Sequence, residues 1–140
     1  MTIQKQEFYE GAALHQLARR GGIASLRYEP PFFIVNGDVI VCLKYSTKNR
    51  SPWAFTFTSD EQVLLRNRAK GSSLVIGLIC GADGIAAIPY KSYREIAAPR
   101  RTALHVSCYR RHGQHYAVSG PDGELARKVA PSLWQRILEK

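Results

Sequence analysis

Three charged residues lie beside apolar segments of the chain. Glu10 falls on a helical segment, where its carboxylate is expected to project near the inward face. Lys44 ends the apolar run 39–43, and Asp38 immediately precedes that run, most simply as the exit residue of a turn. An acid near a buried face needs a partner or a chemical task, whereas a lysine at a strand end is suited to binding phosphate.

The polar stretch 46–52 mixes cations with hydroxyl groups and leads into an aromatic segment. Its composition is typical of a surface loop. Because cations and hydroxyls contact phosphates, we expect Lys48 and Arg50 to bind nucleic acid. Trp53 and Phe55 alternate with smaller residues as in a half-buried strand, which favours core positions for both rings.

The chain is strongly basic. Its 140 residues hold 20 Lys and Arg against 11 Asp and Glu, a formal net charge of +9, which favours a polyanionic partner. Each local group of bases is also compatible with a solvated surface or a helix end. Together they make nucleic acid the expected partner, DNA before RNA, with a protein partner or homodimer also open. The expected contact residues are Lys44, Lys48, Arg50, Arg66, Arg100, Arg101, Arg110 and Arg111.

A separate group of side chains has metal-binding chemistry. His105, Cys108, His112 and His115 are potential zinc ligands that lie close together in the sequence. A strand would place residues 105 and 108 on opposite faces, and the spacing matches no common zinc finger or ribbon. We therefore expect surface histidines on a basic hairpin and no metal site there.

The sequence also bears on the compartment. No apolar stretch approaches the ~18 residues needed to cross a bilayer, so no membrane partner is expected. The N-terminal residues lack the apolar region of a signal peptide. Cys42, Cys80 and Cys108 form no C-x-x-C pair, which is compatible with a reducing compartment. A cytoplasmic location follows as the expectation.

Hydrophobic periodicity predicts the elements that position these groups. The Asn36-Gly37 dipeptide between two β-branched runs predicts a type I′ hairpin turn, and Ser59 with Gln62 suggests a capping box at the second helix. We expect helices over residues 4–20, 59–70, 90–97 and 132–138. Strands are expected over residues 23–28, 32–35, 39–46, 53–57, 73–80, 85–88, 102–109 and 115–118. One domain over residues 1–140 is predicted, with a core over 4–80 and a C-terminal extension over 81–140.

The order of helix, three strands, helix and strand over residues 4–80 resembles the αβββαβ core of the restriction-endonuclease-like, or PD-(D/E)XK, superfamily. The resemblance implies an α/β (α+β) fold with a central mixed sheet, followed here by further strands and a helix. In that family one strand ends in an acid-x-Lys tripeptide, the preceding strand carries an Asp, and the first helix often contributes a Glu. Cys42-Leu43-Lys44 lies at the tripeptide position, so Lys44 matches the lysine, and Glu10 is similar to the helix-borne Glu.

The sequence departs from the family at both acids that bind metal. Cys42 stands at the acid position of the tripeptide, and the preceding strand, Phe32–Val35, carries no acid. Because Mg²⁺ prefers carboxylate and water oxygens, a thiol is a poor substitute. We therefore expect a nucleic-acid-binding domain with a nuclease-like fold, an inactive, degenerate metal site and no cofactor.

Two alternatives stay open. A divergent nuclease dependent on Mg²⁺ or Mn²⁺ would use Glu10, Asp38 and Lys44, whereas a protein-interaction subunit with the same fold would bind an acidic partner. Other enzyme classes have less support, because the sequence contains no P-loop, dinucleotide-binding or nucleophile-elbow motif.

Overall fold

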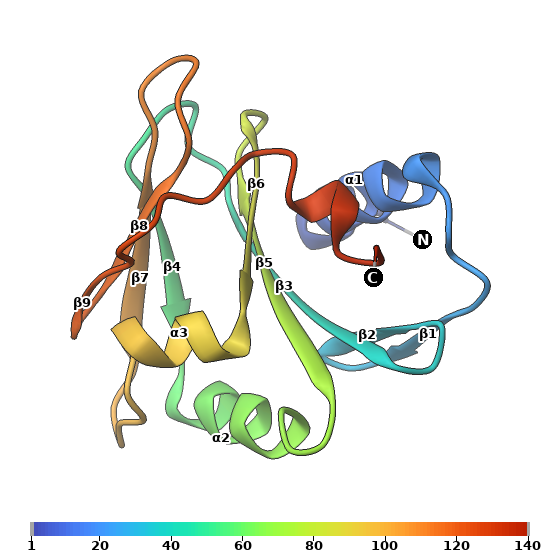
Figure 1. Ribbon diagram of the computed structural model, residues 1–140, viewed down its shortest axis with the longest axis horizontal. Helices are drawn as coiled ribbons and strands as arrows, with labels where there is room; N and C mark the ends of the chain where they lie inside the picture. Colours follow the sequence, from blue (N-terminus) through green and yellow to red (C-terminus); the bar gives the residue numbers. More distant parts are fainter. Residues whose placement is uncertain (1, 140) are drawn as a thin grey trace.

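The protein is a mixed α+β fold built on two β-sheets, as the computed structural model in Figure 1 shows for residues 2–139. In spatial order, sheet A contains β1 (Leu26–Glu29), β2 (Phe32–Val35), β3 (Val39–Ser46), β5 (Ser73–Cys80) and β6 (Gly84–Pro89). Sheet B contains β4 (Trp53–Phe57), β7 (Leu104–Tyr109), β8 (Ala117–Gly120) and β9 (Gly123–Glu124). The helices are α1 (Lys5–Arg20), α2 (Ser59–Arg68) and α3 (Tyr90–Ile96), with a 3₁₀ turn, η1 (Trp134–Arg136).

Sheet A combines an antiparallel meander with a parallel crossover. Strands β1, β2 and β3 pair antiparallel in sequence order, and β5 then pairs parallel to β3. Asn36 and Gly37 have φ values of 55° and 76°, as the predicted type I′ turn requires. The predicted bounds of β2 and β3 are confirmed. The turn fixes the register of the two strands, in which Val35 lies opposite Val39.

Strand β4 follows β3 in the sequence but belongs to the other sheet. The chain leaves sheet A after β3, pairs β4 antiparallel with β7 in sheet B, and returns through α2 to β5. Sheet B therefore takes strands from both the predicted core over residues 4–80 and the predicted extension over 81–140. The outermost residues of the predicted domain, 1 and 140, lie outside the described part of the chain.

The main core lies between the two sheets. Strand β4 buries Trp53, Phe55 and Phe57 against sheet A and exposes its alternate residues, as the pattern predicted. Strand β5 is buried on both faces, because α1 covers the face of sheet A that sheet B does not. Ala13 of α1 accepts a hydrogen bond at its carbonyl from Trp134 Nε1 at 2.9 Å, which ties η1 to α1.

Two helix predictions need correction. Helix α2 is capped one residue earlier than expected, by Thr58 rather than Ser59: its hydroxyl accepts from Glu61 N at 3.1 Å, and Glu61 Oε1 accepts from Thr58 N at 3.0 Å. The helix expected over residues 132–138 is only the turn Trp134–Arg136. Burial of the Trp134 ring fixes this segment by packing, without a longer helix. Within residues 2–139, no helix has the length and apolar character to cross a membrane.

Candidate functional site

A groove of about 440 Å³ opens where β3 extends beyond β2. Strand β2 begins at Phe32, opposite Cys42, and the residues of β3 after this pair border the groove. Helix α1, strand β4 and the first turn of α2 supply the other walls. We call it the acid–lysine groove after the charged residues that line it, Glu10, Lys44 and Glu61.

Lys44 is held inside this groove by an acid. Its Nζ donates a hydrogen bond to Glu61 Oε2 at 2.6 Å and lies 5.1 Å from the centre of the Phe57 ring. Partial burial by itself would raise the pKa of Glu61, but hydrogen bonds from Lys44 and Thr58 outweigh burial and lower that pKa below its usual value. The Glu61 carboxyl group is therefore ionised at neutral pH and forms an ion pair with Lys44.

Glu10 reaches the same groove from α1. Its Oε2 accepts a hydrogen bond from Gln6 Nε2 at 2.8 Å. Burial raises the pKa of Glu10 above its ordinary value, and the negative charge of Glu7 adds to the increase, whereas the Gln6 bond opposes it. The groove thus contains one carboxylate neutralised by a lysine and a second carboxylate without a cation beside it among residues 2–139.

Cys42 lies at the bottom of the groove as a neutral thiol. Its side chain is almost fully buried, and this burial raises its pKa to about 12 in spite of the positive charge of Lys44. A buried thiol is a soft ligand, whereas Mg²⁺ prefers carboxylate and water oxygens, so Cys42 is a poor replacement for an acid at this position.

Asp38 is not brought to the groove. It is exposed in the turn before β3, whereas Lys44 is the sixth residue of that extended strand. At the usual rise per residue the two are about 20 Å apart. The structure therefore joins Glu10 with Lys44 and places Glu61, rather than Asp38, as the second acid.

Sequence reasoning did not single out Glu61 as a candidate site residue. The signal was the capping box itself. Thr58 and Glu61 form the box, whereas the prediction placed it one residue later, at Ser59 and Gln62. An acid that folds back onto its N-cap lies at the start of α2, next to the groove.

The groove does not offer the donor set of a complete magnesium site. Both oxygens of Glu61 already accept hydrogen bonds, from Lys44 and from Thr58 N, and the Cys42 thiol is protonated. Mg²⁺ requires oxygen ligands in near-octahedral geometry, and Glu10 alone remains available. Among residues 2–139, no cluster of three or more His, Cys, Asp or Glu side chains has metal-binding geometry.

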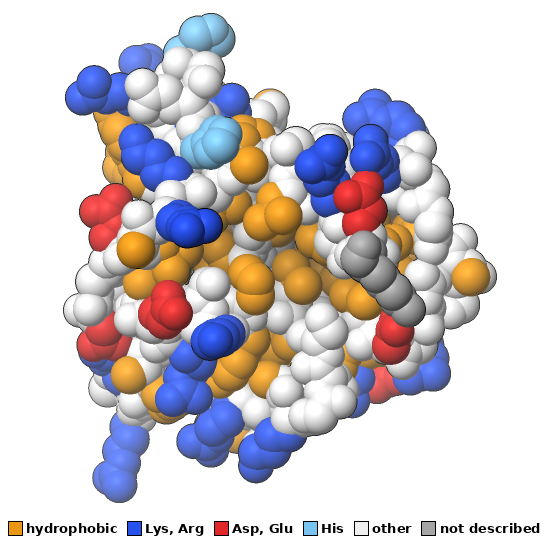
Figure 2. Space-filling view, viewed as in Figure 1, with side chains coloured by type: hydrophobic (Ala, Val, Ile, Leu, Met, Phe, Trp, Pro, Cys, Tyr) orange, Lys and Arg blue, Asp and Glu red, His pale blue; other side chains and the backbone are white. Residues whose placement is uncertain are grey.

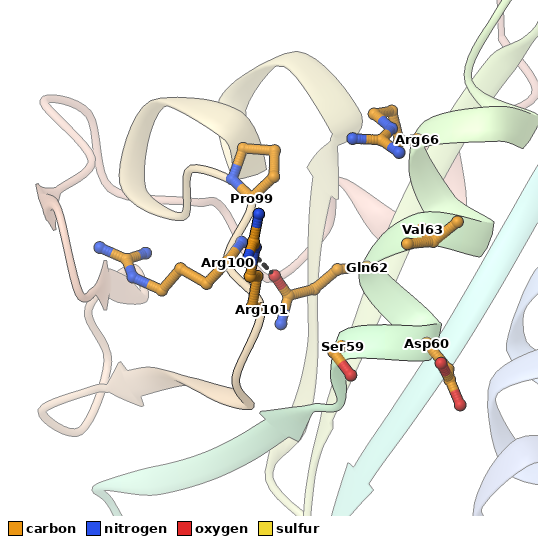
Figure 3. Close-up of a pocket in the computed structure, with 8 residues that line it drawn as sticks. All are labelled: Ser59, Asp60, Gln62, Val63, Arg66, Pro99, Arg100 and Arg101. Carbon is orange, nitrogen blue, oxygen red and sulfur yellow. Dashed lines mark hydrogen bonds between the residues drawn. The ribbon is translucent and has the colours of Figure 1, made fainter.

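A second hollow, of about 420 Å³, lies between α2 and the segment before β7 (Figure 3). Buried Gln62 fixes its wall: Nε2 donates to Thr102 O at 2.9 Å and to Phe57 O at 3.1 Å, while Oε1 accepts from Arg100 N at 2.8 Å. Arg66 from α2 and Arg101 from the loop line the hollow, and both are exposed. We call these two residues the α2 basic cluster.

The guanidinium group of Arg100 turns away from α2 (Figure 3). It forms two hydrogen bonds to Asp122, at 2.6 and 3.0 Å. Arg66 and Arg101 have no ion-pair partner in the described part of the chain, so they are the cations that the hollow offers to an anion.

The other predicted contacts meet at the opposite end of sheet B. Ser51 Oγ donates to Arg110 O at 3.1 Å, which holds the loop with exposed Lys48 and Arg50 against the β7–β8 turn, where Arg111 is exposed. Figure 2 shows Lys, Arg and His side chains gathered at this end of the molecule. We call Lys48, Arg50 and Arg111 the hairpin basic cluster.

Arg110 stabilises this end of sheet B through hydrogen bonds within the protein. Its Nη1 donates to Asp83 Oδ2 at 2.9 Å, and Tyr116 OH donates to the same oxygen at 2.6 Å. Its Nε also donates to Gln114 O at 2.6 Å. Arg110 therefore ties the β5–β6 turn to the β7–β8 hairpin.

The four potential zinc ligands do not converge. His105 is exposed on β7, where its Nδ1 lies 3.0 Å from Thr56 Oγ1, whereas Cys108 of the same strand is buried. His112 and His115 are exposed in and beside the β7–β8 turn.

Comparison with family models, with curated proteins and with solved structures found no match. The arrangement itself presents cations at both ends of sheet B and a lysine in a groove at its edge. Such an arrangement can bind an extended polyanion through several phosphate contacts.

Proposed function

We propose that this protein binds nucleic acid, through a restriction-endonuclease-like core whose metal site is incomplete. The observation that carries the proposal is that Glu10 and Lys44, on α1 and near the end of β3, line one groove. Strand β3, which carries Lys44, belongs to an antiparallel meander that is followed by a parallel strand after α2, in the order that the resemblance implies.

The distribution of charge supports the proposal. The chain has a net charge of +9. The cations of the α2 and hairpin basic clusters form no ion pair with an acid within residues 2–139, so their charges are available to a ligand. The clusters lie beyond opposite ends of β7, a six-residue strand that is itself about 17 Å long. That span matches an extended strand of nucleic acid better than a single small anion.

The chemistry of the groove favours binding over cleavage. Cleavage of a phosphodiester by this class of site needs a metal ion to generate hydroxide and to stabilise developing charge. Glu61 is occupied by Lys44, and Cys42 is a neutral thiol, so the groove lacks the acids for that task. Lys44 remains able to contact a phosphate if the ligand displaces Glu61.

A mobility-shift titration with labelled duplex and single-stranded DNA tests the proposal. Affinity should fall at least tenfold between about 50 and 200 mM salt, because phosphate contacts release counterions. The double variant Arg66→Gln/Arg101→Gln should weaken binding and reduce the salt slope by about two. The variant Arg19→Gln/Lys91→Gln removes the same charge from exposed positions of α1 and α3 and is the matched control.

The remaining results of this titration count against the proposal. Binding that does not change with salt, or equal losses in the two double variants, would remove the support for phosphate contacts. Fragments that form only with added Mn²⁺ and disappear in Lys44→Ala would favour the nuclease alternative. Absence of any shift would favour a protein-interaction subunit.

A further inference from the structure

The outer face of sheet B is open to solvent and lies away from α1 (Figure 1). Along β4 and β7, every second residue points outward, since Trp53, Phe55 and Phe57 occupy the inner positions of β4. The outward residues are small or polar over most of the face, and they are Ala54, Thr56, His105, Ser107, Ala117 and Ser119. These small side chains leave room for planar groups to approach the face.

One large aromatic ring, that of Tyr109, projects from this face of small and polar side chains. Tyr109, the last residue of β7, is 46% exposed. Its cross-strand partner is Ala117, whose small side chain leaves the ring accessible. Exposed aromatic rings on sheets are platforms on which unpaired bases stack.

Two cations lie beside the ring. Tyr109 shares a hollow of about 310 Å³ with Arg111, His115 and Lys128. Arg111 and Lys128 are exposed and have no ion-pair partner within residues 2–139. Glu124 also borders the hollow and is the acceptor available to an N–H group on the edge of a base.

The face continues from Tyr109 to the rest of the proposed interface. The hairpin basic cluster lies at the Tyr109 end and the α2 basic cluster at the other. Thr56 lies on the outer face and also lines the acid–lysine groove, so the two surfaces meet there. A strand on this face therefore has cations at both ends and the groove at its edge.

We propose that single-stranded nucleic acid lies along the outer face of sheet B, with an unpaired base stacked on Tyr109 and its phosphate bound by Arg111 and Lys128. This inference rests on the proposed function and specifies its ligand. A duplex keeps its bases stacked on one another, so it gains nothing from an exposed ring, whereas a single strand gains a stacking partner.

Fluorescence anisotropy with two labelled probes tests the inference, one an oligothymidine of about 12 nucleotides and the other a duplex of the same length. Tyr109→Ala should weaken binding of the single strand about tenfold and change duplex binding less than twofold, because only the stacked base is lost. Tyr109→Phe keeps the ring and should bind both probes as the unmodified protein does. Tyr28→Ala, which removes an exposed tyrosine from β1, is the matched control.

A second variant keeps the test informative if the aromatic substitution alters the hairpin. Arg111→Gln/Lys128→Gln leaves the ring in place and should weaken single-strand binding while thermal unfolding stays unchanged.

Three results would overturn the inference. If Tyr109→Ala binds oligothymidine normally while the duplex still binds in a salt-dependent way, the site is wrong and the proposed function stands. If neither probe binds the unmodified protein, the proposed function fails as well. Polyglutamate that competes as well as oligothymidine, with the same dependence on Tyr109, would assign this face to an acidic protein.

Discussion

Lys44 Nζ lies 2.6 Å from Glu61 Oε2 inside a groove that Glu10 also lines. Lys44 is thus paired with one acid, and a second acid lines the same groove. Its charge is therefore unavailable to a ligand unless the Glu61 contact breaks, so Glu61 limits the affinity of the groove for anions.

Removing the charge of Glu61 should strengthen nucleic-acid binding. Glu61→Gln keeps a side chain that can complete the capping box, since Glu and Gln both serve at that position. We expect affinity in mobility shift to rise about fivefold, which corresponds to the ~1 kcal/mol of one charge pair about 4 Å apart in water.

Glu7 provides the control for this substitution. It also accepts a hydrogen bond from its N-cap residue, Gln4 N, at 2.9 Å, but it lies on α1 without contact to Lys44. Glu7→Gln should leave affinity unchanged within twofold. An equal increase in both variants would mean that net charge alone, and not release of Lys44, governs binding.

Glu10→Gln should stabilise the fold at neutral pH. The pKa of Glu10 is raised in the folded state by burial, so ionisation of this acid opposes folding. The penalty is full above the raised pKa and absent below the ordinary value for glutamate, where both states are protonated. Chemical denaturation at pH 7 and pH 3 measures it, and the variant should gain stability only at the higher pH. A gain of equal size at both values would point to packing instead.

Gln62 should be among the most sensitive polar positions. Its side chain makes three hydrogen bonds to the main chain of Phe57, Arg100 and Thr102, and it is 5% exposed. Gln62→Leu leaves these groups unsatisfied, at a cost of about 2–4 kcal/mol in the free energy of unfolding measured with urea. Asn67→Ala, an exposed change on the same helix, should cost less than about 0.5 kcal/mol. Equal effects would contradict the role assigned to Gln62.

Gly81 should tolerate no side chain. Its φ is +54°, and an added Cβ would lie 2.2 Å from the Lys48 carbonyl oxygen. Gly81→Ala is expected to lower the unfolding free energy by about 2 kcal/mol or more and to weaken nucleic-acid binding, because Lys48 must move. Gly11→Ala meets no atom within 4 Å in the middle of α1 and should raise stability by about 0.5–1 kcal/mol. Thermal unfolding of the two alanine variants gives opposite shifts if this holds.

Local patterns predicted the strands of sheet A well. The Asn36-Gly37 turn fixes a hairpin by itself, and an unbroken apolar run such as Ser73–Cys80 indicates a strand covered on both faces. The alternation in Trp53–Phe57 identified a buried face of β4 but carried no information about which sheet would bury it. Pairing partners far along the chain are not encoded in the period of one strand.

The candidate site was predicted only in part for a similar reason. Glu10 and Lys44 were recognised from their apolar surroundings, whereas Glu61 depends on where α2 starts relative to β3. Counting bases also overstated the cations available to a ligand. Arg100 and Arg110 are engaged by Asp122 and Asp83, partners that are remote in sequence.

The excursion of the chain into sheet B after β3 makes the two halves of the sequence interdependent. Strand β4 pairs with β7, and the chain passes through α2, β5, β6 and α3 between these two strands. Each sheet is therefore completed by strands that come later in the chain. A fragment that ends at residue 80 would expose the inner aromatic face of β4. Truncation from the C-terminal side therefore removes β7, the strand that holds β4 in the groove wall, so the two halves of the chain depend on each other to fold.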